Sequence, residues 1–325
     1  MSTFLIIDLA HLMNRARYVV RGPIDEAIGL ALHITIGSIR QAAKKYNADH
    51  LVVVAEGRSW RKDYDAKYKL NRAVKRDTAT PKEKEESDIF YSAFNDLQTF
   101  INEKTNCTVL QHKCCEADDL IAGWIQTHPN DQHVLISGDS DFQQLLAPNV
   151  IIFDGVNGKT LTLEGVYNEK GKPIVDKKTK LPLKIDPEWV LFLKIIRGDT
   201  SDNVFSAYPG VRENKIREAF ENRHVQGYAW CNFMKSHWND HEQKDNMVED
   251  RYKHNKVLID LTAQPEQIKM FIAETIKYAY DNSKNIPGNT IGFSFLKLCG
   301  KFSLDKFSAN SNEIIDIFKK KLIKG

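Results

Sequence analysis

The chain has 325 residues, about twice the roughly 150 residues of an ordinary domain, which predicts two domains. Hydrophobic residues make up 42% and charged residues 27%, a globular composition that excludes wholesale disorder. No apolar run approaches the ~20 residues of a membrane-spanning helix, and the first residues lack the basic region of a signal peptide. Five cysteines without a CxxC pair argue against a disulfide framework and a zinc ribbon. We therefore expect a cytoplasmic protein.

Positive and negative charges are segregated along the chain, although the net charge is only 46 − 43 = +3. Residues 58–76 contain eight basic residues and two acids, a net charge of 8 − 2 = +6. Acids gather elsewhere in three tight groups. This separation suits a protein that binds a polyanion through one surface and cations through another. For the basic segment alone, a solvated charged helix is the simpler alternative.

Strand-like and helix-like segments alternate in the first half of the chain. Short apolar, β-branched runs predict buried strands, and apolar residues at helical spacing predict amphipathic helices. This alternation predicts an α/β fold whose parallel sheet is covered on both faces. The predicted strands are 4–7, 50–54, 108–110, 133–137 and 149–153, and the predicted helices are 25–46, 89–101 and 117–125.

The character of the chain changes after the fifth predicted strand. Residues 155–185 are rich in Gly, Lys, Thr and Pro, and their local alternation predicts a hairpin insertion. From Asp186 onward most patterns are helical, so we predict two regions, 1–185 and 186–325. The helices predicted in the second region are 189–196, 215–220, 252–259 and 267–279.

Acids follow the ends of three predicted strands. They are Asp8, Glu56 and Asp139, with Asp141 two residues further on. The carboxyl ends of parallel strands meet at one edge of a sheet, where ligands bind. We therefore expect these carboxylates to gather at that edge.

Two further acidic groups lie elsewhere in the sequence. Glu116, Asp118 and Asp119 open a predicted helix, where capping explains one acid but not three. Asp199 and Asp202 are three residues apart, a spacing that can place both on one face.

The combined acids predict a metal centre. So many like charges around one crevice would raise each other's pKa and destabilise the fold without cations. Oxygen-only ligands suit Mg²⁺ or Mn²⁺, and a set this large favours two ions that clamp a reacting phosphate. For any single acid, a helix cap or a surface charge remains the alternative. The nine predicted metal ligands are Asp8, Glu56, Glu116, Asp118, Asp119, Asp139, Asp141, Asp199 and Asp202.

Three acidic motifs carry a family resemblance. Glu-Ala-Asp-Asp at 116–119, Gly-Asp-Ser-Asp-Phe at 138–142 and Gly-Asp-Thr-Ser-Asp-Asn at 198–203 resemble those of the 5′ nucleases in order and spacing. That superfamily includes flap endonucleases, the 5′ nuclease domain of bacterial DNA polymerase I and phage ribonuclease H. The resemblance extends from about Asp8 to Asp260, and the compact chain without a polymerase domain resembles the stand-alone phage branch.

The resemblance implies a PIN-like fold, in which helices flank a mostly parallel sheet. It also implies a helical arch inserted at about 58–88, under which single-stranded DNA threads or is clamped. A mainly helical, helix–hairpin–helix-like DNA-binding region would lie within 186–325.

Several residues match nucleic-acid contacts of the family. In the arch motif, Lys69 matches a lysine that contacts the scissile phosphate, Arg72 a phosphate-binding arginine and Tyr68 a base-stacking aromatic residue. On a helix, Lys69 and Arg72 would share a face. Arg61 fits a further cation at the base of the arch.

Two positions depart from the family pattern. Glu56 replaces the usual aspartate, which predicts a longer or water-mediated contact to metal. Arg212 replaces the second glycine of the hairpin turn at 208–215, so Arg212 and Lys215 are expected to contact phosphate directly.

The resemblance implies a Mg²⁺-dependent structure-specific 5′ nuclease, acting as 5′→3′ exonuclease, flap endonuclease and ribonuclease H. Asp8, Asp118, Asp139 and Lys69 would be catalytic, with two Mg²⁺ ions that Mn²⁺ can replace. The expected substrates are branched or flapped DNA and RNA–DNA hybrids, from which primers or flaps are removed during replication.

A monomer is expected, in the host cytoplasm if the chain is phage-encoded. Candidate protein partners are a single-strand-binding protein and a clamp. The alternatives are a PIN-like ribonuclease, a Mg²⁺-dependent phosphatase and a non-catalytic DNA-junction binder.

Overall fold

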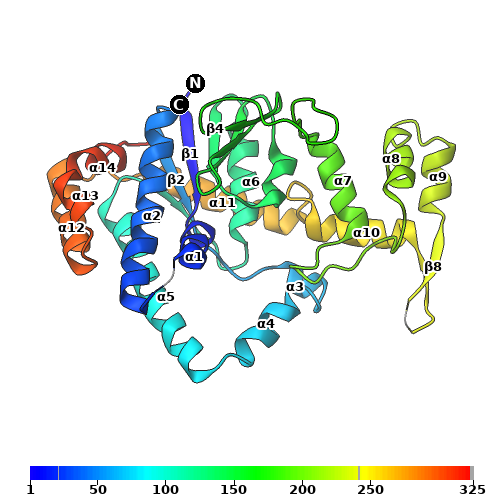
Figure 1. Cartoon of the computed structure of the whole chain (residues 1–325), viewed down its shortest axis with the longest axis horizontal. Coiled ribbons are helices and arrows are strands. Elements are labelled where there is room, and N and C mark those ends of the chain that lie inside the picture. The colour runs from blue at the N-terminus through cyan, green and yellow to red at the C-terminus, as the bar shows by residue number, and fades with distance from the viewer. Residues whose placement is uncertain (21, 241, 323–325) are drawn as a thin grey trace.

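A seven-stranded sheet forms the centre of the computed structural model, which describes residues 1–20, 22–240 and 242–322 (Figure 1). The strand order is β3-β2-β1-β4-β5-β6-β7. The first five strands in sequence are parallel, and β6 and β7 extend the sheet in antiparallel pairing. The strands of this sheet are β1 (Thr3–Asp8), β2 (His50–Val54), β3 (Thr108–Leu110), β4 (Gln132–Ile136), β5 (Val150–Asp154), β6 (Lys159–Leu161) and β7 (Val166–Asn168).

Helices cover both faces of this sheet, which confirms the predicted α/β class. Seven of the helices were predicted, and six of these begin and end within four residues of the predicted pattern, whereas α5 begins at Pro81 instead of residue 89. None of the described helices combines the length and the apolar character that a membrane span requires. The helices are α1 (Leu9–Val19), α2 (Ile24–Lys45), α3 (Arg61–Tyr64), α4 (Leu70–Asp77), α5 (Pro81–Lys104), α6 (Ala117–Thr127), the short 3₁₀ helix η1 (Ser140–Leu145), α7 (Pro187–Arg197), α8 (Glu213–Glu221), α9 (Tyr228–Met234), α10 (Val248–Ile259), α11 (Glu266–Asp281), α12 (Gly288–Lys301), α13 (Asp305–Ala309) and α14 (Ser311–Phe318).

The buried residues of β1 alternate between two cores. Leu5 and Ile7 pack with α1, α2, α5 and the C-terminal helices α12–α14. Phe4 and Ile6 point to the other face, where α6 and α11 cover the sheet. This alternation follows from the two-residue period of a strand, and it explains why β1 reads as a continuous apolar run.

The sequence analysis missed α1, which begins directly after β1. Asp8 ends the strand and caps the helix, because its Oδ1 accepts a hydrogen bond of 2.9 Å from the backbone N–H of His11. Leu9, Leu12, Met13 and Ala16 are buried at helical spacing, a pattern that could have revealed the helix. One residue therefore serves as strand end, helix cap and member of the acidic edge.

A smaller module projects from the far ends of α7 and α10 (Figure 1). It contains α8, α9 and a two-stranded hairpin formed by β8 (His237–Asn239) and β9 (Asp245–Met247). Its core is shared with α7, because Trp189 and Phe192 of that helix belong to the same buried cluster as Phe220 and Phe233. The predicted division of the chain at residue 186 stays a prediction.

The segment between β2 and α5 forms an arch, as the resemblance implied (Figure 1). It is built from α3, α4 and the first turns of α5, which project from the body of the molecule. The start of α5 is held by a capping box, in which Thr80 and Glu83 bond each other's backbone N–H at 3.3 and 2.7 Å. The turn between α4 and α5 is therefore well defined.

Candidate active site

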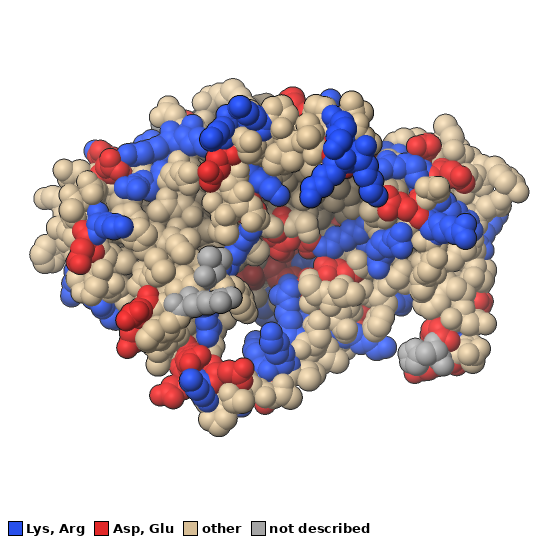
Figure 2. Space-filling view, viewed as in Figure 1, with Lys and Arg blue, Asp and Glu red and all other residues tan. Residues whose placement is uncertain are grey.

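Acidic side chains line the floor of a central hollow above the arch (Figure 2). Asp8, Glu56 and Asp139 follow β1, β2 and β4, and Asp118 comes from the first turn of α6. The sequence correctly predicted that the first three would follow parallel strands at one edge. Within the described residues the carboxylate of Asp118 accepts no hydrogen bond, so it is free to bind a ligand.

Three of these acids, Asp8, Glu56 and Asp118, have raised pKa values. Burial raises the pKa of Asp8 to about 6, with Asp139 adding to the rise. Loss of hydration raises the pKa of Glu56 to about 7 although solvent still reaches its side chain, and the charge of Asp8 contributes. Burial, with Asp8 and Glu56 nearby, raises the pKa of Asp118 well above its usual range. A cation bound among these carboxylates would offset both the burial of their charges and their mutual repulsion.

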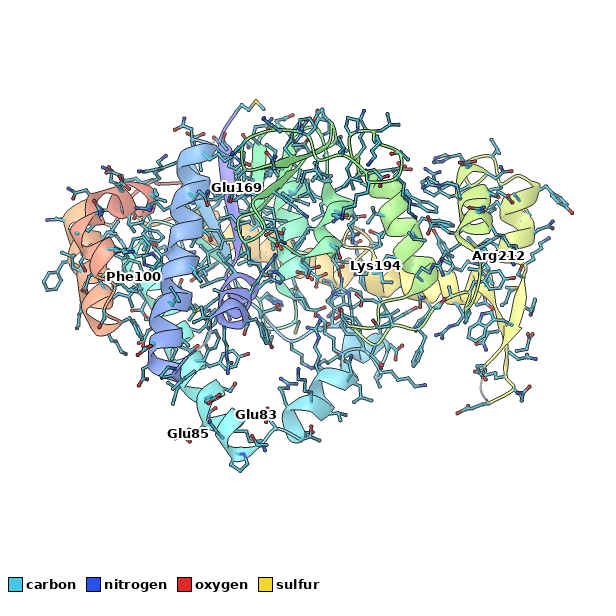
Figure 3. All side chains as sticks on the ribbon, in the orientation of Figure 1. Glu83, Glu85, Phe100, Glu169, Lys194 and Arg212 are labelled. Carbon is cyan, nitrogen blue, oxygen red and sulfur yellow. The ribbon has the colours of Figure 1, made fainter. Side chains whose placement is uncertain are left out.

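A lysine that sequence reasoning missed lies between two of the predicted ligands. Lys194 of α7 points into the site (Figure 3), where its ammonium forms an ion pair with Asp141 and lies 2.7 Å from Asp199 Oδ2. Burial alone would raise the pKa of Asp199, but the bonds from Lys194 hold it below its usual value. The sequence did contain a signal for Lys194, because this lysine lies in the last turn of a predicted helix that leads directly into the 198–203 motif.

Lys69 occupies a similar position between two other acids. Its Nζ lies 2.5 Å from Glu116 Oε1 and 3.6 Å from Asp202 Oδ2. Burial opposes the charge of Lys69, but these carboxylates raise its pKa above the usual value. The two lysines therefore provide positive charge among the acids.

This arrangement bears on the predicted metal centre. Among the described residues, no three His, Cys, Asp or Glu side chains are close enough together to enclose an ion. The lysine ammonium groups stand between the carboxylates instead. The donor set itself is all oxygen, which fits a hard divalent cation.

Arg61 and Asp119 differ from the sequence-based assignment. Asp119 is 0% exposed, and its two oxygens accept bonds from Arg61 and from Trp60 Nε1 at 2.9–3.1 Å. Arg61 is 1% exposed and also bonds Glu116 and the carbonyl of Leu258 at 2.7 and 2.8 Å. A buried arginine needs such partners. These two residues hold the base of the arch together, and their side chains are buried and bonded to each other.

Tyr68 and Lys69 also differ in detail from the expectation. Tyr68 is 5% exposed and packs beside Ile195 and Val204, while its hydroxyl donates a 2.8 Å bond to Asp202, so its ring presents no stacking surface here. Lys69 has a φ of 54° and precedes α4, so it does not share a helix face with Arg72. The side chains of Lys69 and Arg72 nevertheless both contact Asp202. The left-handed backbone at Lys69 turns its side chain back toward the acids.

The base of the arch is bonded to the 198–203 motif. The backbone N–H of Lys69 donates to the Asp202 carbonyl at 2.8 Å, and Asn71 Nδ2 donates to the Thr200 carbonyl at 3.0 Å. In return, Asn203 Nδ2 donates to the Lys67 carbonyl at 2.7 Å. The two asparagines were not among the predicted site residues, and they join the arch to the acidic loop as one unit.

Arg212 and Lys215 lie outside the acidic hollow. Both are exposed at the start of α8, and Figure 3 shows Arg212 on the projecting module. Gly210 before them has a φ of 70°, and Lys215 Nζ lies 3.3 Å from the Tyr208 hydroxyl. Their predicted role as phosphate contacts therefore concerns nucleic acid away from the acids.

Comparison with known proteins gives the family. Residues 3–171 match the family model of the 5'-3' exonuclease, N-terminal resolvase-like domain. The chain belongs to the 5′ nuclease superfamily.

Individual relatives agree with this membership. The chain is 26% identical over 314 residues to ribonuclease H of Enterobacteria phage T4, across 91% of this chain and 90% of the relative. It is 27% identical over 175 residues to the flap endonuclease Xni of Shewanella loihica, across 53% of this chain and 62% of the relative. The T5 D15 protein co-crystallised with metal ions has a similar fold, with a TM-score of 0.62 and 21% identity across 87% of this chain and 100% of that one.

Replacing Lys194 by methionine tests whether this lysine stands in for a cation. We expect Lys194→Met to lower the metal-free unfolding free energy by about 1–3 kcal/mol, because two part-buried carboxylates lose their partner. We expect Mn²⁺ to bind more tightly, because no ammonium has to be displaced. Thermal unfolding in EDTA and calorimetric Mn²⁺ titration measure the two effects.

Lys256→Met is the matched control, because Lys256 pairs with buried Asp260 at 2.5 Å outside the predicted ligands. It should lower stability without changing Mn²⁺ affinity. Weaker Mn²⁺ binding by Lys194→Met would contradict the displacement of this lysine by metal.

Asp118→Asn should stabilise the metal-free protein. Because the folded pKa of Asp118 lies above its unfolded value, the folded state is favoured at low pH and loses stability as pH rises through the folded pKa. The neutral amide removes that loss, so we expect Tm in EDTA at about pH 8 to rise by about 1–2 °C, as about 1 kcal/mol would give in a chain of this length. The gain should shrink at about pH 5, where the wild-type carboxyl is more protonated. An equal gain at both pH values would argue against a charge effect.

Proposed function

We propose that this member of the 5′ nuclease superfamily is a divalent-metal-dependent nuclease acting on flapped DNA and RNA–DNA hybrids. The observation that carries the proposal is the acidic hollow beside the arch, with Lys69 at the junction of the two. A cleavage site for a polyanion needs carboxylates for metal and cations for phosphate, and this hollow contains both.

The proposed ligands form two sets. Asp8, Glu56, Asp118 and Asp139 would hold one Mg²⁺, with a longer or water-mediated contact for Glu56. The second set would be Glu116, Asp141, Asp199 and Asp202, which the two lysines now bridge. Such ions activate a water and stabilise charge on the phosphate oxygens, and Mn²⁺ can replace Mg²⁺.

The cations of the arch would act on the phosphate. Lys69 lies at the edge of the hollow, so its ammonium can turn from Glu116 to the scissile phosphate and stabilise the charge that grows there. Arg72 is half-way exposed beside it and would bind a neighbouring phosphate. Both would orient the strand against the acids. The products would carry 5′-phosphate and 3′-hydroxyl ends.

The proposed biological task is removal of RNA primers or flaps during replication. The names of the T4 ribonuclease H and of the Shewanella flap endonuclease support this choice. Within residues 186–325, Arg212 and Lys215 would hold duplex phosphate at the projecting module. A single-strand-binding protein or a clamp would be the replication partner, and the enzyme would act as a cytoplasmic monomer.

Cleavage of a 5′-flap substrate tests the proposed function. Wild type should cut it in Mg²⁺, and Asp139→Asn should abolish cleavage while binding the flap within about tenfold of wild type, because it removes a ligand and no phosphate contact. Single-stranded and duplex controls report structure specificity. Binding without any metal-dependent cleavage by wild type would identify a non-catalytic junction binder instead.

Lys69→Ala separates a catalytic role from a binding role. We expect single-turnover cleavage to fall by about 100-fold, or about 2.7 kcal/mol, because an electrostatic stabiliser of the transition state is lost. Affinity should fall much less, since other phosphate contacts remain. Lys82→Ala, an exposed lysine at the start of α5, is the control and should leave the rate unchanged. Equal losses of rate and affinity would make Lys69 a binding residue only.

A further inference from the structure

A lysine-rich segment, residues 169–184, lies between β7 and α7 and has no part in the site described so far. It contains six lysines and two acids, a net charge of 6 − 2 = +4 in a chain whose total is +3. All six lysines are exposed, and none is ion-paired with a described acid. These lysines are Lys170, Lys172, Lys177, Lys178, Lys180 and Lys184.

The segment is a defined extension of the sheet. The N–H of Ile174 donates to the Val166 carbonyl of β7 at 2.7 Å, and the N–H of Leu183 donates to the Ile174 carbonyl at 2.8 Å. Backbone bonds therefore hold both of its sides to the sheet edge. A charged surface held in this way loses little conformational freedom when it binds a ligand.

Two tight turns present the lysines. Asn168 Oδ1 accepts the backbone N–H groups of Lys170 and Lys172 at 3.0 and 3.1 Å. In the second turn, Asp176 Oδ1 accepts the N–H groups of Lys178 and Thr179 at 2.8 and 2.7 Å. The carboxylate of Asp176 therefore holds the backbone of the turn, and four exposed lysines lie within four residues of it in a turn that has no other acid.

The segment shares a face with the acidic hollow. Figure 2 shows a group of basic side chains over the loops near the first turn of α7, on the same side of the molecule as the acids. The chain enters α7 directly from Lys184, and the last turn of that helix carries Lys194 into the site. A polyanion that reaches the acids and leaves on the side opposite the arch would pass these lysines.

The composition of the segment indicates which ligand it suits. It contains no aromatic residue, so it has no platform on which unpaired bases could stack. Lysine ammonium groups on exposed turns match regularly spaced phosphates without regard to sequence. Val175 and Leu181 are also exposed, and they would instead suit an acidic protein surface. The shared face with the hollow favours nucleic acid.

We propose that residues 169–184 bind the phosphate backbone of a duplex arm of the substrate, outside the cleavage site and opposite the arch. This inference rests on the proposed nuclease function and adds a second duplex contact to that expected at α8. Under this inference, residues 169–184 increase the affinity for nucleic acid and favour branched substrates over unbranched ones. Chemistry at the acids does not depend on it.

The test is equilibrium binding in EDTA, so that affinity is measured without cleavage. Labelled 5′-flap substrates have their two duplex arms shortened one at a time, and anisotropy is followed over a salt series. The variant Lys177→Ser/Lys178→Ser/Lys184→Ser leaves Lys180 in place, because its φ is 61° and its turn should stay intact. We expect about tenfold weaker binding of the long-armed substrate and a salt slope shallower by about 2–3 units.

The arm-length series locates the contact. Wild type should lose affinity when one particular arm is shortened, and the triple variant should no longer respond to that change. The matched control, Lys269→Ser/Lys277→Ser/Lys297→Ser, removes three exposed lysines of α11 and α12 and should bind all substrates as wild type does. Single-turnover cleavage at saturating substrate should be the same for wild type and both variants.

Three results decide between the outcomes. Wild-type affinity and salt slope in the triple variant would overturn the inference and leave an acidic protein as the occupant. An equal loss on long-armed and short-armed substrates would also overturn it. If wild type binds through these lysines but cuts nothing in Mg²⁺ or Mn²⁺, the inference stands as a duplex contact and the proposed nuclease function fails.

Discussion

Repulsion among carboxylates at one edge of a parallel sheet is the constraint on which this structure depends. The strands end together, so the acids that follow β1, β2 and β4 cannot avoid each other. Burial and mutual charge raise the pKa values of Asp8 and Glu56 to about 6 and about 7. A fold that keeps such groups close must supply positive charge from elsewhere.

An arginine and two lysines supply that charge in two different ways. Arg61 is fully enclosed at the base of the arch, where it pairs with Asp119 and with one oxygen of Glu116. Lys69 and Lys194 are less enclosed and sit between acids that are also suited to metal. The buried pair of Arg61 and Asp119 is therefore structural. Lys69 and Lys194, by contrast, lie where a divalent ion would bind in the proposed enzyme. Lys69 belongs to the arch and also contacts the acids, so in the proposed function it would connect substrate binding by the arch with the acidic site.

The bonds between the arch and the 198–203 motif extend this link. Asp202 is contacted by Tyr68, Lys69 and Arg72. A change in the charge or the ligands of Asp202 would therefore alter the contacts that hold the base of the arch. Outside the hollow, the lysine-rich segment and the start of α8 carry exposed lysines and Arg212. In the proposed function these would guide the flanking nucleic acid, while the central lysines act at the cleaved bond.

Much of the fold and of the site could be predicted from the sequence, because the relevant signals are local. Apolar runs identified the parallel strands, helical spacing identified about half of the described helices, and the spacing of three acidic motifs indicated the family that the match over residues 3–171 supports. Only the tertiary structure decided which way neighbouring residues face. Asp118 and Asp119 are adjacent, yet about 100° of rotation per helical residue turns one to the hollow and the other to Arg61. The role of Lys194 depends on its ion pair with Asp141, which lies 53 residues away in sequence. Tyr68 is buried by side chains from α7 and α10, and the lysines of 169–184 share a face with the acids only because the sheet continues through β6 and β7. Charge and periodicity are properties of the chain, but a side chain's partner is set by packing between segments that the sequence keeps far apart.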